Sequence, residues 1–117
     1  MKVVIISNTD YNFSAKLSKI CNDQSDDLLF CDDFIDLSKK NVSNSLIILD
    51  YDDEVENLDK VKSISKKISN STFCIIMKNI NSDTQKKLTQ LGFDLIMSKQ
   101  SFLINFSTIK KQFLLQK

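Results

Sequence analysis

The sequence predicts an α/β fold built on a five-stranded parallel sheet. Five short apolar runs lie along the chain, and the segments between them repeat apolar residues every three or four positions. Continuous apolar runs are typical of parallel strands covered on both faces. Apolar residues at every third or fourth position are typical of helices that bury one side. Right-handed crossovers between such elements give a doubly wound sheet with helices on both faces.

The apolar runs are expected to be strands because each is short and bounded by polar residues. They cover residues 3–6, 28–31, 46–49, 73–77 and 95–97. Most of the intervening segments are expected to be helices because of their apolar spacing and their position between strands. These helices cover residues 13–20, 33–39, 55–68 and 102–113.

The helix after the fourth run has start and stop signals of its own. Ser82-Asp83-Thr84-Gln85 has the form of a capping box, in which a serine caps the helix and a glutamine three residues later bonds back. The helix is expected to end at Leu91. Gly92, the only glycine in the chain, suits the left-handed position that follows a helix.

Composition excludes several classes of function. The chain has 16 basic residues, all of them lysine, against 15 acidic ones, for a formal net charge of +1. Such a chain has no field that steers it to nucleic acid or to a membrane surface, and it lacks the bidentate fork of arginine. Histidine is absent, which excludes Ser-His and Cys-His nucleophile pairs and histidine metal ligands. We expect no nucleic-acid partner and no membrane insertion.

The cysteines and the N-terminal run indicate a cytoplasmic protein. Cys21, Cys31 and Cys74 lack paired metal-ligand spacing, and their apolar neighbours indicate buried, reduced thiols. The N-terminal apolar run stops at Ser7, which is too short for a signal peptide or a membrane helix. With 117 residues, residues 1–117 are expected to form a single domain with no output domain.

Two charged residues end apolar runs. Asp50 follows Leu46-Ile47-Ile48-Leu49, and Lys99 follows Leu95-Ile96-Met97-Ser98. Parallel strands end at one edge of the sheet, where such folds bind ligands, so this carboxylate and this ammonium are expected to meet. An aspartate after a strand is also commonly a turn or helix-capping residue. No glycine-rich phosphate loop follows any run, which argues against nucleotide binding.

These features together resemble the receiver domain of bacterial response regulators, and the resemblance covers the whole chain. The segment Leu91-Gly92-Phe93-Asp94-Leu95-Ile96-Met97-Ser98-Lys99 is similar to the family's Gly-Ala-Asp-Asp-Tyr-x-x-Lys. The resemblance implies a flavodoxin-like (βα)5 three-layer sandwich with strand order 2-1-3-4-5. It also implies that Asp50 accepts a phosphoryl group from a histidine kinase and that Lys99 is the partner of that phosphate or of Asp50.

Several positions depart from the family pattern. Receivers carry an acidic pair after the first strand that holds magnesium, and the uncharged Ser7 and Asn8 stand there. Met77 replaces the hydroxyl residue that ends the fourth strand, and Lys78 replaces the small residue that follows it. In receivers that hydroxyl residue acts as a switch by turning toward the phosphoryl group, and an aromatic residue moves with it. Ile96 stands at the position of this aromatic residue. The switch chemistry is therefore expected to be impaired.

Magnesium binding is expected to be weakened for the same reason, and no other cofactor is expected. Magnesium needs only one or two protein carboxylates, so Asp50, the backbone carbonyl of Asp52 and a relocated acid, Asp10, are the candidate ligands. Structural roles compete with this hypothesis. Asp10 is expected to cap the first helix, and Asp52 is an acid near a helix N-terminus, where the dipole favours it. Lys78 is expected to add a second positive charge at the edge.

We expect an atypical receiver-like domain of a phosphorelay that binds a partner protein, with weak or no phosphorylation. It is not expected to be an enzyme beyond self-phosphorylation and dephosphorylation on Asp50. One alternative is a working phosphoacceptor on Asp50 with a rearranged magnesium site. Another is an unrelated flavodoxin-like carrier of a flavin or of sugar phosphotransfer, for which Ser7-Asn8-Thr9-Asp10 offers only a minimal phosphate loop.

The expected partner is a histidine kinase or a downstream target. Receivers commonly bind such partners through the last two helices and the last strand. Ile80, Leu88 and Ile96 lie in or beside these elements, and each is either part of that surface or part of the core. The sequence does not predict the oligomeric state.

Overall fold

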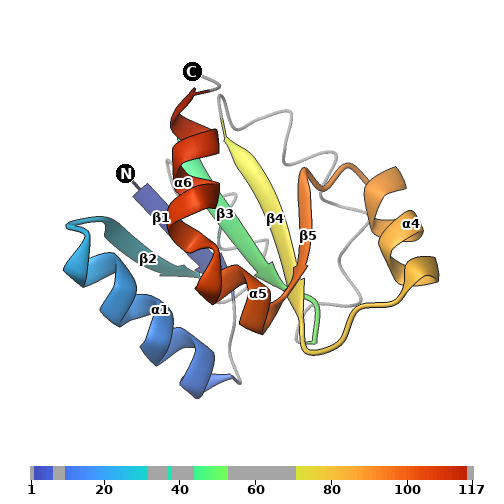
Figure 1. Cartoon of the computed structure of the whole chain (residues 1–117), viewed down its shortest axis with the longest axis horizontal. Coiled ribbons are helices and arrows are strands. Elements are labelled where there is room, and N and C mark those ends of the chain that lie inside the picture. Colours follow the sequence, from blue (N-terminus) through green and yellow to red (C-terminus); the bar gives the residue numbers. More distant parts are fainter. Residues whose placement is uncertain (1, 7–9, 32–36, 38–43, 53–70, 116–117) are drawn as a thin grey trace.

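A computed structural model of the chain describes residues 2–6, 10–31, 37, 44–52 and 71–115. Five strands in these residues form one parallel sheet with the order β2-β1-β3-β4-β5 (Figure 1). They are β1 (Lys2–Ile6), β2 (Asp27–Cys31), β3 (Ser45–Asp50), β4 (Thr72–Met77) and β5 (Leu95–Ser98). The α/β class, the parallel sheet and its strand order are confirmed, and each strand ends within one residue of its expected bounds.

The helices of the described residues pack beside the sheet. They are α1 (Tyr11–Asp23), α4 (Ser82–Gln90), α5 (Lys99–Ile104) and α6 (Phe106–Leu115). In Figure 1, α1, α5 and α6 lie in front of the sheet, and α4 flanks it beside β5. The expected helices at 33–39 and 55–68 lie outside the described residues, apart from Leu37, which is buried in the core.

Side chains of the central strands alternate between two apolar clusters. Val3 and Ile5 of β1 pack in the cluster that includes Leu17 of α1 and Phe102 of α5. The alternate residues of the same strand pack in the cluster that includes Leu88 of α4. Successive strand residues point to opposite faces, so both faces of this strand are covered. This is the physical reason for its continuous apolar sequence.

The start of α4 differs from the capping-box prediction. The N-cap residue is Asn81, in an extended conformation, and its Oδ1 accepts a hydrogen bond from the Thr84 backbone N–H at 2.8 Å. Ser82 is instead the first residue of the helix. Because asparagine is among the best N-cap residues, the residue before the expected box takes that role.

The end of α4 confirms the role of Gly92. Its φ is 101°, in the left-handed region that glycine adopts without steric cost. The Gly92 N–H donates to the Thr89 carbonyl at 3.2 Å, and the Phe93 N–H donates to the Leu88 carbonyl at 3.4 Å. These two bonds are a Schellman motif, and Phe93 and Leu88 also share one apolar cluster.

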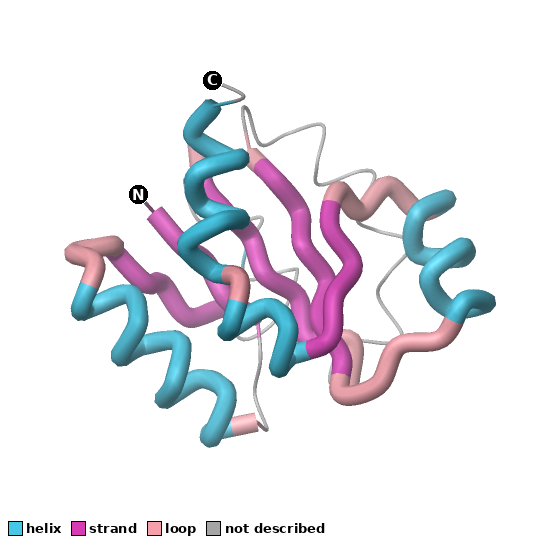
Figure 2. Tube along the Cα trace, viewed as in Figure 1, coloured by secondary structure: helices cyan, strands magenta, loops and turns pink. Residues whose placement is uncertain are grey.

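The last predicted helix, 102–113, is wrong as a single element. A short turn at Asn105 separates α5 from α6, as Figure 2 shows by its colouring. The backbone N–H and the side-chain Nδ2 of Asn105 both donate to the Ser101 carbonyl, at 3.0 and 2.9 Å. The first of these is a regular helix bond, and the side-chain bond to the same carbonyl is of the local kind that competes with helix hydrogen bonding. The apolar face nevertheless persists, because Phe102 and Phe106 are both buried.

Cys21, Cys31 and Cys74 are buried thiols, as expected for reduced core cysteines. Burial raises the pKa of the Cys21 thiol to about 11, with a further contribution from the charge of Asp26. That thiol is therefore protonated at neutral pH and is a poor nucleophile.

Among the helices of the described residues, none combines the length and the apolar character needed to cross a lipid bilayer.

Candidate functional site: a lysine shared by three carboxylates

The carboxyl edge of the sheet brings Asp50 and Lys99 together. Asp50 is the last residue of β3, and Lys99 is the first residue of α5, directly after β5. The Lys99 Nζ lies 3.0 Å from the Asp50 Oδ2. The Asp50 side chain is completely buried, whereas that of Lys99 is 14% exposed. A buried carboxylate is costly without a charged partner, so this ion pair satisfies a strong requirement of the fold.

Two further carboxylates bind the same ammonium. The Lys99 Nζ lies 2.9 Å from the Asp10 Oδ2 and 3.0 Å from the Asp52 Oδ2. We call these four residues, Asp10, Asp50, Asp52 and Lys99, the Lys99 cluster. An ammonium group has three N–H donors, so Lys99 can serve all three carboxylates at once.

Each carboxylate also accepts a backbone N–H, which fixes its position. The Asp10 Oδ1 accepts from the Phe13 N–H at 3.0 Å and caps α1. The Asp50 Oδ1 accepts from the Asp52 N–H at 3.0 Å. The Asp52 Oδ2 accepts from the Lys78 N–H at 3.2 Å. Backbone groups after β3, after β4 and at the start of α1 therefore hold the acids around the lysine.

The cluster keeps its lysine and Asp10 charged at neutral pH. Burial by itself would lower the pKa of Lys99, but the hydrogen bonds with Asp10, Asp50 and Asp52 raise it above the ordinary lysine value. The Lys99 hydrogen bond, followed by the Phe13 backbone N–H, lowers the pKa of Asp10. With all four groups ionised, one positive and three negative charges leave the cluster with a net charge of −2.

We expect the stability that Asp10 contributes to depend on pH. Its pKa is lower in the folded protein than the ordinary 3.8. Its contribution is therefore present above about pH 4 and is lost as the pH falls through the folded value. Asp10→Asn keeps a good N-cap group but removes the charge. Urea unfolding should show a less stable variant at neutral pH and a difference that shrinks toward about pH 3. A difference that stays constant over this range would contradict the role of the charge.

The cluster does not fit a magnesium ion at the point where its acids converge. Lys99 already holds an oxygen of Asp10, Asp50 and Asp52 within 3.0 Å, so a metal ion there would face an ammonium. In the described part of the chain, no group of three or more Asp, Glu, Cys or His side chains is arranged to hold a metal. A magnesium ion would require a different arrangement of these side chains.

The other residues singled out in the sequence have separate places. Met77 is buried in the core beside Leu88, and Ile96 packs against the same cluster. Lys78 is exposed and contributes its backbone N–H to Asp52. Ser7 and Asn8 lie outside the described residues. No hydroxyl group of a residue at the end of β4 is therefore available to the Lys99 cluster, since Met77 stands there.

A surface cavity of about 790 Å³ adjoins the cluster. Asp10 and Lys99 belong to its lining, which connects it to the cluster. Lys16 and Lys78 add positive charge, and Ile104 adds an apolar surface that is 73% exposed. Nothing in the sequence pattern predicts this cavity, because its walls come from the start of α1, the end of β4 and α5.

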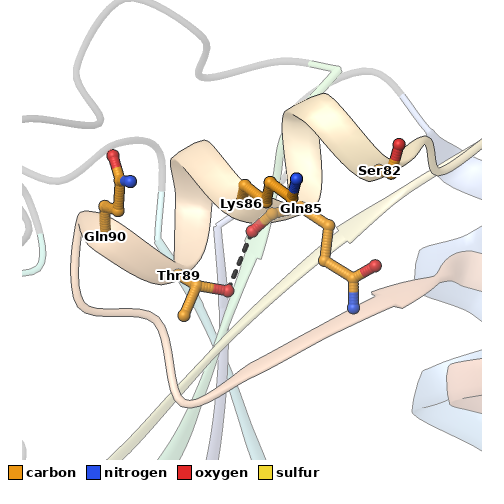
Figure 3. Close-up of a pocket in the computed structure, with 5 residues that line it drawn as sticks. All are labelled: Ser82, Gln85, Lys86, Thr89 and Gln90. Atoms are coloured by element: carbon orange, nitrogen blue, oxygen red, sulfur yellow. Dashed lines mark hydrogen bonds between the residues drawn. The ribbon is translucent and has the colours of Figure 1, made fainter.

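A second hollow of about 440 Å³ lies on α4 (Figure 3). The described residues that line it, Ser82, Gln85, Lys86, Thr89 and Gln90, all belong to polar residue types. The Thr89 hydroxyl donates to the Gln85 carbonyl at 2.8 Å, which is the dashed line in the figure. None of these residues belongs to the Lys99 cluster.

No protein-family model and no curated protein matches the sequence.

Sequence reasoning paired Asp50 with Lys99 but did not predict the other two contacts of the lysine. Asp10 was expected as a helix cap or a metal ligand, and it caps α1 while also binding Lys99. Asp52 was expected either to offer its backbone carbonyl to a metal or to lie as an acid near a helix N-terminus, whereas its carboxylate belongs to the cluster. The available signal was position: both acids stand within a few residues of a strand's carboxyl end.

Proposed function

We propose that the chain is a receiver-like signalling domain with a flavodoxin-like, doubly wound three-layer fold. In this proposal it works in a phosphorelay by binding a partner protein, with weak or no phosphorylation. The observation that carries the proposal is the ion pair between buried Asp50 and Lys99 at the carboxyl edge of a sheet ordered 2-1-3-4-5. In such sheets this edge is where ligands bind.

The electrostatics of the Lys99 cluster support weak phosphorylation. Catalysis of phosphoryl transfer depends on positioning and on neutralising the charge of the incoming group. Here Lys99 is already shared by three carboxylates. Both oxygens of Asp50 also have partners, Lys99 on Oδ2 and the Asp52 N–H on Oδ1. A phosphoryl donor would approach a group with a net negative charge, which disfavours its binding.

The alternative is a working phosphoacceptor on Asp50. The contact between Asp50 and Lys99 favours it, because an ammonium beside the acceptor can stabilise an added phosphoryl group. Amide NMR spectra of the native chain and of Asp50→Asn, titrated with magnesium and then beryllofluoride, separate the two functions. Shifts around Asp50, Met77 and Lys99 in the native chain only would establish the phosphoacceptor. No shifts would favour action by binding alone.

We propose that the partner binds at the face formed by α4, β5 and the helices after β5. Of the three apolar residues suggested there, Leu88 is fully buried in the core and Ile96 packs against it. Ile80 is 39% exposed just before α4, and Ile104 is 73% exposed at the end of α5. Among the described residues of this face, Ile80 and Ile104 are therefore the large apolar side chains exposed to a partner.

Affinity capture followed by mass spectrometry tests this proposal. Ile80→Glu and Ile104→Glu should abolish capture of the proteins that the native chain retains, because a charge at an apolar contact must be desolvated. Asp50→Asn should capture the same proteins as the native chain. Asn22→Glu adds the same charge to an exposed position of α1 and should have no effect. Loss of capture by Asp50→Asn alone would instead show that phosphorylation controls binding.

A further inference from the structure

The Asp52 carboxylate binds two donors that come from different parts of the fold. Its Oδ2 lies 3.0 Å from the Lys99 Nζ and accepts the Lys78 N–H at 3.2 Å. Lys78 directly follows β4, and Lys99 directly follows β5. The two donors thus converge at the carboxyl edge of the sheet, beside Asp50, whose Oδ2 lies 3.0 Å from the same ammonium.

An ammonium and a backbone N–H that converge on one oxygen are the donors that proteins use to bind oxyanions. The Asp50 Oδ2 and the Asp52 Oδ2 share the Lys99 Nζ. A negatively charged group attached to Asp50 would therefore need the same ammonium that Asp52 now occupies. The carboxylate of Asp52 has the charge and the acceptor atoms of such a group.

Asp10 binds the same lysine but does not occupy the position that Asp52 occupies between two donors. Its Oδ1 is held by the Phe13 N–H as the cap of α1, so the backbone group that it uses belongs to a helix and not to a strand end. Asp52 is also only two residues from Asp50, and its own N–H donates to the Asp50 Oδ1. The turn after β3 thus places the Asp52 carboxylate beside the Asp50 carboxylate.

We propose that Asp52 is an internal occupant of an oxyanion position formed by the Lys99 ammonium and the Lys78 N–H. It excludes anionic groups from Asp50 until it is displaced. The inference rests on the proposed function in taking Asp50 as the residue that such a group would modify. The Asp52 side chain is 43% exposed, so it can exchange both contacts for water, and the position is closed by competition and not by burial.

Beryllofluoride, which coordinates a carboxylate oxygen and presents acceptor fluorides, is the probe for this proposal. It is titrated at constant magnesium into the native chain, Asp52→Asn, Asp52→Ala and Asp27→Asn, with binding followed by amide NMR. Both Asp52 variants retain the backbone carbonyl and remove one negative charge. Asp27→Asn makes the same charge change at the start of β2, at the opposite edge of the sheet. There Asp27 lies opposite Lys2 in the register between β1 and β2.

Both Asp52 variants should bind beryllofluoride on the order of tenfold more tightly than the native chain and Asp27→Asn, because a like charge and a competing ligand are removed. Without any probe, the Lys78 amide signal should shift in both Asp52 variants and stay in place in Asp27→Asn, since Asp52 accepts from that N–H. Far-UV circular dichroism checks that all four proteins are folded.

Equal or weaker binding in the Asp52 variants would overturn the inference, and so would an unmoved Lys78 signal. The capture experiment on the same proteins separates this failure from failure of the proposed function. If the native chain still captures its partner while the Asp52 variants gain no affinity, only the occupancy of the oxyanion position is wrong. If Ile80→Glu and Ile104→Glu leave capture unchanged, the proposed partner face is wrong, whatever the beryllofluoride result.

Discussion

Lys99→Met is expected to lower the free energy of unfolding by about 3 kcal/mol or more, because removing one partner of a buried ion pair leaves an uncompensated charge. The remaining charge on Asp50 would be fully buried, and the carboxylates of Asp10 and Asp52 would stand beside it. Methionine keeps an unbranched side chain, so the loss comes from the missing ammonium. Urea unfolding at neutral pH measures the effect.

Two further proteins make the Lys99 result specific. Lys19→Met removes a lysine from an exposed position of α1 and should change stability by about 0.5 kcal/mol or less. Lys99→Met combined with Asp50→Asn should be more stable than Lys99→Met alone, because the buried position then carries no charge. A loss of under about 1 kcal/mol in Lys99→Met would show that the cluster behaves as an ordinary surface ion pair.

Phe102→Ala is expected to cost about 3 to 5 kcal/mol, the usual range for a large aromatic residue in a core. Phe102 is fully buried, and its ring centre lies 6.1 Å from that of Phe13 and 5.7 Å from that of Phe106. It joins α1, α5 and α6 within one apolar cluster. The alanine variant leaves a cavity directly beneath the helix that begins at Lys99, so amide signals near Lys99 should also broaden or shift.

Phe30→Ala is the matched control for this substitution. Phe30 is in β2 and is 49% exposed, so the same truncation removes less buried apolar surface. Its cost should be about 1 kcal/mol in urea unfolding. Equal losses in the two variants would contradict the assignment of Phe102 to the centre of the core.

The sheet was predictable from the sequence because its strands are buried on both faces. In β3, every residue is buried, and the four residues between Ser45 and Asp50 are all apolar, as a strand covered on both faces requires. The ion pair followed from the same reasoning, since β3, which Asp50 ends, and β5, which Lys99 follows, both end at the carboxyl edge of one parallel sheet. Gly92 was predictable because few residues other than glycine adopt a φ of 101° without strain.

The start of α4, the break at Asn105 and the full set of Lys99 contacts could not be predicted from local sequence alone. Asn81 and Ser82 both suit an N-cap, and the position of the chain after β4 decides between them. The helix is interrupted at Asn105, whose side chain bonds the Ser101 carbonyl, and the apolar spacing of the segment does not reveal this. The contacts of Asp10 and Asp52 with Lys99 require a tertiary structure that places the start of α1 beside the ends of β3 and β5.

The contact between Asp10 and Lys99 has a consequence for the order of folding. These residues are 89 positions apart in the sequence, and β5, which precedes Lys99, lies at the edge of the sheet, two strands away from β3. Contacts of such long range form only after most of the chain entropy has been lost. We therefore expect the three acids to lack their lysine partner during refolding until β5 has joined the sheet. Formation of the ion cluster marks the completed domain.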